Sequence, residues 1–152
     1  MILYKKNHYP SWVSWDDVIK KLDSEFTEGS HYLQVSGGPS DFHPRVGVVC
    51  HNNYFPGTLN DLVRLVQPDL ESKYDYCDVD VYVSFCKDAC NHGRHCDDKD
   101  VLIVQAIGRM EYGFDDGKLY VLDPGDSIFI PKGVYHNPTV HSPRATISFG
   151  LL

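Results

Sequence analysis

The sequence contains no long hydrophobic run. Its apolar stretches are a few residues long, far short of the roughly 20 residues that a membrane-spanning helix needs. Residues 1–9 carry Lys5 and Lys6 without a following apolar stretch, so we expect neither a signal peptide nor a membrane span. Basic residues are also few, because 14 lysines and arginines stand against 21 aspartates and glutamates, a net charge of −7. This balance disfavours non-specific binding to nucleic acid.

Cysteine is too scarce and too irregularly spaced for a disulfide framework. The chain has 5 cysteines, an odd number, which favours a reducing compartment and a cytoplasmic location. The set Cys86, Cys90, Cys96 and His92 lacks the paired Cys-x2-Cys knuckles of structural zinc sites. The chain also has neither a Gly-x-Ser-x-Gly elbow nor a P-loop, which disfavours the hydrolases and nucleotide-binding proteins that use them.

The composition is that of an ordinary globular protein. With 152 residues, of which 42% are hydrophobic and 23% charged, the chain has room for one hydrophobic core. We therefore expect a single domain over 1–152. Its helices belong to 1–77, and 78–152 forms the core of a barrel.

Two helices are expected in the first half. Ser14 can cap a helix with Asp17 three residues later, and apolar residues recur at helical spacing over 15–26. A second helix is expected to begin at Thr58 and to end at Pro68. Segments between them suggest two short strands, 32–35 and 46–50, with a turn at 37–39.

Short β-type runs separated by turn residues follow from residue 78 onward. The expected strands are 79–85, 101–107, 110–114, 118–122, 127–130 and 145–151, with hairpin turns at 115–117 and 123–125. This spacing predicts a mainly β fold, a barrel or sandwich, with the N-terminal helices packed on it.

A histidine and a carboxylate stand two residues apart directly before one of these strands. His95 and Asp97 share one face if the backbone is extended, and a second histidine, His136, follows the turn after strand 127–130. Two imidazoles and one carboxylate on one side of an ion leave its other positions open, as in the facial triad of non-haem Fe(II) oxygenases. We therefore expect these three residues to be metal ligands and catalytic residues. On spacing alone, a solvated turn at Asp97 with histidines bonded to the backbone remains the alternative.

Two motifs carry a resemblance to a known family. Residues 125–136 resemble the second cupin motif, Gly-x5-Pro-x-Gly-x2-His. Residues 95–108 resemble the His-x-Asp-x2-Asp-Val-x3-Gln-x2-Gly signature of the JmjC-like cupins, which include the bacterial ribosomal oxygenases, and 146–150 resemble their closing strand. The resemblance implies a double-stranded β-helix that binds Fe(II) through His95, Asp97 and His136. It also implies hydroxylation of a protein side chain or a small molecule, with 2-oxoglutarate and O2 as co-substrates.

The sequence departs from this family at the anchor for 2-oxoglutarate. The family has a basic residue two positions after the glycine that matches Gly108, and here that position is Met110. Arg109 is basic, but a shift of one residue along a strand turns a side chain to the opposite face.

Arg144 offers another anchor. It shares strand parity with Thr146 and resembles the Arg-x-Ser/Thr anchor on the last strand of other 2-oxoglutarate oxygenases. Because a guanidinium binds a carboxylate bidentately, we expect Arg144 and Thr146 to contact the co-substrate. A solvent-exposed arginine after Pro143 is the alternative. Gln105 is a third candidate for contact with the co-substrate; it either lines the pocket or bonds to a neighbouring strand.

Three functions are left open by the sequence. The first is an Fe(II)- and 2-oxoglutarate-dependent oxygenase, acting on a small molecule or a peptide and possible as a homodimer. The second is a metal-binding cupin that does not use 2-oxoglutarate, such as another dioxygenase, an isomerase or a sensor. The third is a non-catalytic binding module.

Overall fold

The computed structural model describes residues 1–27, 34–36, 47–50, 54–87 and 93–152. Of 25–27, 34–36 and 47–50 it describes the backbone only. The helices are α1 (Trp15–Thr27) and α2 (Gly57–Glu71). The strands are β1 (Leu3–Lys5), β2 (Gln34–Ser36), β3 (Gly47–Cys50), β4 (Cys77–Ser84), β5 (Asp100–Ile107), β6 (Met110–Phe114), β7 (Leu119–Leu122), β8 (Ser127–Ile130), β9 (His136–Val140) and β10 (Arg144–Leu151). The turn expected at 37–39 and the residues Cys90 and His92 lie outside the described residues.

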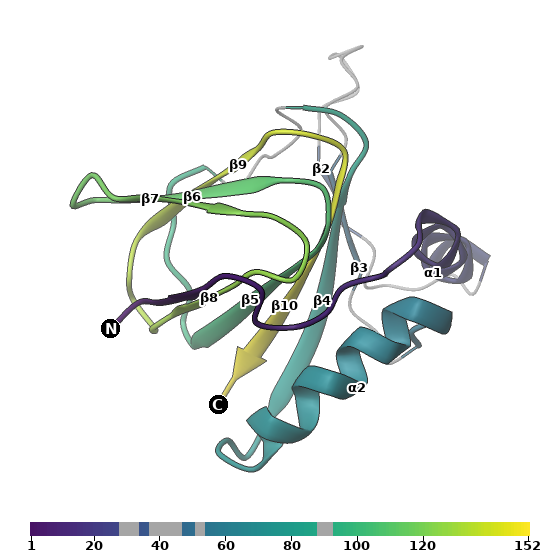
Figure 1. Cartoon of the computed structure of the whole chain (residues 1–152), viewed down its shortest axis with the longest axis horizontal. Helices are drawn as coiled ribbons and strands as arrows, with labels where there is room; N and C mark the ends of the chain where they lie inside the picture. The colour runs from purple at the N-terminus through teal and green to yellow at the C-terminus, as the bar shows by residue number, and fades with distance from the viewer. Residues whose placement is uncertain (28–33, 37–46, 51–53, 88–92) are drawn as a thin grey trace.

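The strands form two antiparallel sheets (Figure 1). The larger has seven strands in the order β1-β8-β5-β10-β4-β3-β2, and the smaller has three in the order β7-β6-β9. Their facing surfaces pack against each other, and the chain is a double-stranded β-helix of the cupin type, as expected from the sequence. Strands β1 to β3 show that the first 50 residues extend the large sheet as well as contributing a helix.

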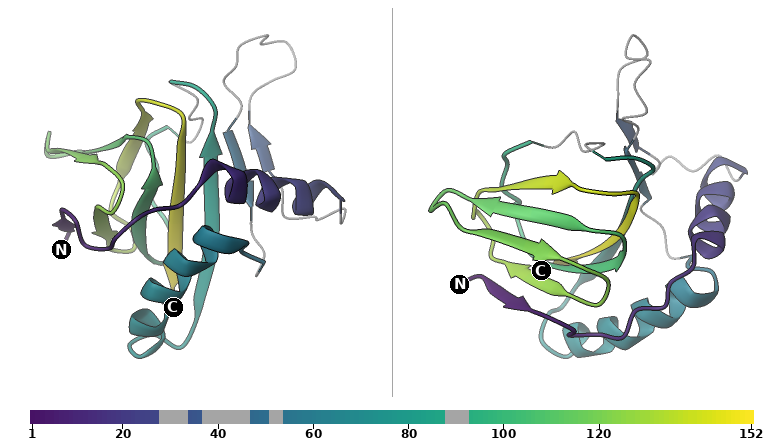
Figure 2. Two further views of the ribbon diagram at one scale, coloured as in Figure 1. Left: turned by 45° about the vertical axis from the view of Figure 1, so that its right-hand side comes forward. Right: turned by 45° about the horizontal axis from the view of Figure 1, so that its top comes forward.

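Two hydrophobic clusters lie on opposite faces of the large sheet. Along β5, Leu102 and Val104 point to the outer cluster, whereas Val101 and Ile103 point between the sheets. The outer cluster includes apolar side chains of both helices, which therefore cover this face (Figure 2). Successive side chains of a strand point to opposite faces, so a strand buried on both sides reads as the continuous apolar run seen at 101–104.

Helix α1 begins as predicted, but α2 differs from the prediction at both ends. The Ser14 hydroxyl accepts a hydrogen bond from the Asp17 backbone N–H at 3.2 Å, which caps α1. Thr58 does not cap α2; its hydroxyl bonds to the Asp17 carboxylate instead. Helix α2 also runs past Pro68, because Leu70 packs on the outer cluster and holds the last turn in place. In the described part of the chain, neither helix is long and apolar enough to cross a bilayer.

The six strands predicted after residue 78 are confirmed within one or two residues at each end, and two others were not predicted. Strand β1 has three residues, too few for a visible alternation. Strand β9 contains Pro138, which argues against a central strand. It is tolerated because β9 lies at the edge of the three-stranded sheet, where β6 is its one neighbouring strand among the described residues.

Candidate metal centre

Backbone hydrogen bonds join the two predicted histidines directly. The N–H of His95 donates to the carbonyl of His136 at 2.9 Å, and the reverse bond is 2.8 Å. The backbone N–H of Gly133 donates to the carbonyl of Asp97 at 3.0 Å. Gly133 has φ +78°, a left-handed conformation that favours glycine, so the turn before His136 is fixed against the Asp97 segment.

This pairing brings the three predicted ligands together. One side-chain ligand atom from each of His95, Asp97 and His136 lies within 4.8 Å of the others. The His136 Nε2 atom is 3.5 Å from the Asp97 carboxylate, and the two imidazole centroids are 4.4 Å apart. The geometry therefore gathers two nitrogens and a carboxylate oxygen at one point.

Each histidine is held in the tautomer that a metal requires. His95 Nδ1 lies 2.9 Å from the Gly93 carbonyl, and His136 Nδ1 lies 2.9 Å from the Val134 carbonyl. A carbonyl can only accept, so each ring donates from Nδ1 and carries its lone pair on Nε2. In this tautomer it is the Nε2 atom of each ring that can bind a metal.

The surroundings of His136 keep its ring neutral. The side chain is 4% exposed, and the rings of Tyr112 and Phe114 lie 6.4 Å from it. Burial lowers the pKa of His136, and nearby His95 lowers it further, against the raising effects of the Val134 carbonyl and Asp97. A metal binds neutral imidazole, so this environment suits a ligand.

The three groups open into a cavity between the two sheets, the inner cavity, of about 50 Å³. Its lining consists of Tyr82, His95, Asp97, Ile103, Met110, Tyr112, His136, Pro138, Arg144 and Ser148. A mixed lining of apolar side chains and a few polar groups is typical of small-molecule sites.

Arg144 is buried in this lining. It is 4% exposed, so the alternative of a solvent-exposed arginine is wrong. Its Nε donates to the Ser84 hydroxyl at 2.9 Å, and its guanidinium lies 5.7 Å from the centroid of the Tyr82 ring. Burial raises the pKa of Tyr82, which keeps the phenol protonated. The arginine is thereby oriented by side chains of β4.

Gln105 and Thr146 do not line the inner cavity. The Thr146 hydroxyl donates to Gln105 Oε1 at 2.8 Å, and Gln105 Nε2 donates to the carbonyls of Ile107 and Gly108. Both side chains are buried in these bonds, which tie β10 to the end of β5. Gln105 therefore bonds to a neighbouring strand, as one of the two alternatives for it predicted. The co-substrate contact expected for Gln105 and Thr146 is not seen in the lining of the inner cavity.

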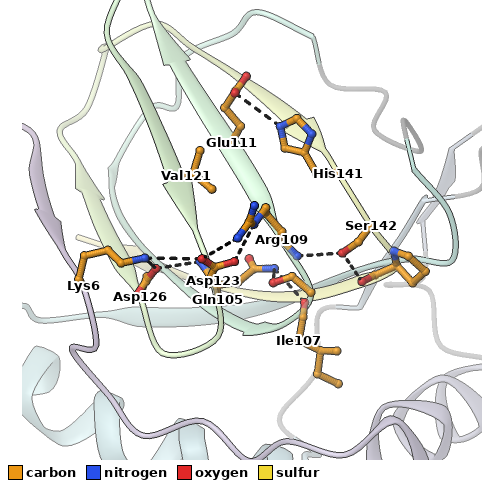
Figure 3. A network of polar contacts seen from close by, with 12 residues as sticks. Lys6, Gln105, Ile107, Arg109, Glu111, Val121, Asp123, Asp126, His141 and Ser142 are labelled. Atoms are coloured by element: carbon orange, nitrogen blue, oxygen red, sulfur yellow. Dashed lines mark hydrogen bonds and ion pairs between the residues drawn. The ribbon is translucent and has the colours of Figure 1, made fainter.

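Arg109 points away from the inner cavity, as its parity predicted. Figure 3 shows its guanidinium against Asp123, with Nε and Nη2 donating to the two carboxylate oxygens at 2.8 and 3.2 Å. Asp123 also lies 3.6 Å from Lys6, which pairs with the buried Asp126. Arg109 is therefore part of an outer network that attaches the N-terminal segment to the barrel.

Tyr82 and Ser84 were not predicted to be site residues. A signal for them was present in β4, where polar side chains at 78, 80, 82 and 84 alternate with Val79, Val81 and Val83. The valines belong to the outer cluster, so the alternation places the polar set on the inner face.

The donor set fits a divalent first-row metal. Two imidazole nitrogens and one carboxylate oxygen from one side of the site match the ligands that non-haem Fe(II) proteins use. Of the cysteines, Cys77, Cys86 and Cys96 form no disulfide within the described residues.

The solved structures that share this fold include those of a ribosomal oxygenase. No protein-family model matches the sequence, and neither does any curated protein. The structure of YcfD, a ribosomal oxygenase from Escherichia coli, aligns with a TM-score of 0.71 and 18% identity over 99% of this chain and 47% of that one. The same protein in complex with cobalt and 2-oxoglutarate gives a TM-score of 0.67 at 18% identity, over 99% and 47% of the two chains. This chain thus spans about half the length of that protein, and it shares with it the cupin-type double-stranded β-helix that the motifs predicted.

Proposed function

We propose that this chain is an Fe(II)- and 2-oxoglutarate-dependent oxygenase that hydroxylates a protein side chain or a small molecule. The observation that carries the proposal is the convergence of His95, Asp97 and His136 on one point of a cavity that Arg144 also lines. The fold shared with the E. coli ribosomal oxygenase, whose structure was solved with cobalt and 2-oxoglutarate, supports it.

The three ligands have distinct tasks in this proposal. His95 and His136 bind the metal through Nε2, and the Gly93 and Val134 carbonyls hold the rings in place. Asp97 supplies the negative charge that a divalent ion needs. When bound, Fe(II) would couple the oxidative decarboxylation of 2-oxoglutarate by O2, which yields succinate and CO2, to the hydroxylation of a substrate C–H bond. The chain itself orients the co-substrate and limits access of water to the site.

Arg144 binds the distal carboxylate of 2-oxoglutarate in this proposal. Its buried guanidinium is oriented by Ser84 and lines the same cavity as the ligands. Guanidinium and carboxylate match each other in a two-bond geometry. The apolar Met110 lines the same cavity from the small sheet, so the charge for the anchor comes from β10 instead of β6.

The test is anaerobic titration of the Fe(II)-loaded protein with 2-oxoglutarate. We expect a weak charge-transfer band in the visible range and, in air, succinate formation that depends on both Fe(II) and 2-oxoglutarate. His136→Ala should abolish both. Stoichiometric metal binding without the band or succinate would overturn the 2-oxoglutarate assignment.

One observation favours a second candidate, a metal-binding cupin that does not use 2-oxoglutarate. Met110 occupies the position where the related family has its basic anchor, and it is fully buried. Under this candidate, His95 and His136 still bind metal, but Arg144 has no effect on 2-oxoglutarate turnover because there is none.

A further inference from the structure

We propose that a second cavity, on the outer face of the large sheet, binds a small molecule with an apolar body and one carboxylate. This outer cavity is separate from the inner one and does not depend on the proposed oxygenase activity. It measures about 470 Å³, within the usual range of roughly 300–1,000 Å³ for small-molecule sites.

The outer cavity has an apolar floor and walls from two distant parts of the chain. Leu102 of β5 and Phe129 of β8 form the floor, and Leu3 and Leu70 lie beside them. One wall is β1 with the residues that follow it, and the other is the end of α2 with the turn to Tyr74. Strand β1 is the edge of the large sheet, and the segment after it and the end of α2 lie on the helix-covered side (Figure 2). Leu102 is 6% exposed and Leu3 is 47% exposed, so the cavity runs from the core to the surface.

The charges at the outer cavity favour an anion. Two lysines line it, Lys5 from β1 and Lys73 from the turn after α2, and Asp69 is the only acidic residue among the described residues of its lining. Within the described residues, neither lysine is in an ion pair, whereas Lys6, Lys99 and Lys118 are. A carboxylate on the ligand would form an ion pair with these two ammonium groups.

The other titratable groups that line the outer cavity are uncharged at neutral pH. His8 Nδ1 lies 2.6 Å from the Ser127 hydroxyl, and the ring lies 4.0 Å from that of Tyr9. Burial lowers the pKa of His8, and Lys5 lowers it further, against a raising effect of Asp69. Burial raises the pKa of Tyr9 and of Tyr74, with smaller raising effects of Asp69 and Asp100. None of these groups adds negative charge that would repel the ligand.

A small molecule fits this cavity better than a second copy of the chain. Each copy carries a net charge of −7, so association of two copies is opposed by their overall repulsion. A monocarboxylate with a short alkyl or aryl body carries a single negative charge, so it meets the apolar floor and the two lysines at a much smaller cost in overall repulsion.

The test is an NMR titration of the full chain with octanoate, compared with octanamide, which has the same apolar body without the charge. We expect saturable shifts at the amides of Leu102, Phe129 and Leu70, tighter binding of octanoate, and a rise in the pKa of His8 when the carboxylate is bound. Charge reversal in Lys5→Glu/Lys73→Glu should weaken octanoate about tenfold and leave octanamide unchanged. Lys118→Glu reverses an exposed charge away from the cavity and should change neither.

Four results would overturn the proposal. One is the absence of saturable shifts in a protein whose amide spectrum shows that it is folded. A second is equal binding of octanoate by the parent and the double charge-reversal variant. A third is a set of shifts confined to residues around His136, which would place the carboxylate at the metal centre. The last is concentration-dependent dimerisation, seen by light scattering, with shifts at Phe129 in the absence of ligand, which would assign the cavity to a second copy.

Discussion

Replacing Arg144 with methionine is expected to remove 2-oxoglutarate binding while leaving metal binding intact. The guanidinium is 4% exposed, so a carboxylate bound to it is shielded from water. Loss of one partner from such a buried pair costs about 3–5 kcal/mol, because the other charge is left uncompensated. At about 1.4 kcal/mol per factor of ten, the dissociation constant of 2-oxoglutarate should rise roughly 10²- to 3 × 10³-fold.

The assay measures the charge-transfer band against 2-oxoglutarate concentration in the Fe(II)-loaded protein, together with metal content. Arg144→Lys keeps the charge and loses the two-bond geometry, so it should fall between the parent and Arg144→Met. Arg109→Gln is the matched control, because Arg109 is an arginine whose guanidinium pairs with Asp123 outside the inner cavity. It should leave 2-oxoglutarate affinity unchanged.

An exchange of the two anchor positions gives the sharpest form of this test. Met110 and Arg144 line the same cavity, so Met110→Arg added to Arg144→Met keeps one guanidinium there. We expect the double variant to recover part of the affinity lost by the single one. A folded Arg144→Met protein with the parent's affinity for 2-oxoglutarate would refute the assignment of the anchor.

Three further results follow from the geometry. His136→Ala removes a proposed metal ligand, so the metal affinity should fall by more than the roughly 10–100-fold that follows from removing a residue hydrogen-bonded to a ligand. Metal analysis after dialysis measures this, and retention of the metal would contradict the site. Gly57 has φ +51°, and an added Cβ would lie 2.6 Å from the Asp17 carboxylate, so Gly57→Ala should lower the free energy of unfolding by about 1–3 kcal/mol in a denaturant titration. Hydrogen bonds from the Thr58 hydroxyl and N–H lower the pKa of Asp17, so its stabilisation is present above the unfolded-state pKa and is lost as the pH falls through the folded-state value. Asp17→Asn should therefore lower the melting temperature at pH 7, and its difference from the parent should shrink as the pH falls below the unfolded-state pKa of aspartate; a constant difference would contradict this.

The six strands predicted after residue 78 could be found because each is bounded by turn residues and is apolar enough to be buried, whereas β9, with its Pro138, is not such an apolar run. The end of α2 was not predictable, since Pro68 removes one hydrogen bond locally and the packing of Leu70 on the sheet compensates for it. The role of Thr58 was also out of reach. Its partner Asp17 lies 41 residues earlier, and only the packed helices bring the two together.

The convergence of the three proposed ligands, His95, Asp97 and His136, was predictable from motif spacing, whereas the cavity around them was not. Strand parity assigned Arg109 to the outside and Arg144 to the same face as Thr146. It could not indicate that Gln105 and Thr146 would bond to each other. The register shifts between Ala145 and Thr146 in the pairing with β5, and such irregularities are not visible in the sequence.

The proposed ligands and the proposed anchor are specified by different parts of the structure, which explains how the ligand residues can match the family motif while the anchor position does not. The positions of His95 and His136 depend on reciprocal main-chain bonds, and that of Asp97 on a main-chain bond from Gly133. Such bonds require a fixed spacing of residues, so the positions of the three side chains depend on the spacing within each motif. The anchor needs only a guanidinium at some inward-facing position of the barrel. Both β6, at Met110, and β10, at Arg144, have such a position. A basic residue can therefore move from the position of Met110 to that of Arg144 without any change in the backbone that holds the metal ligands.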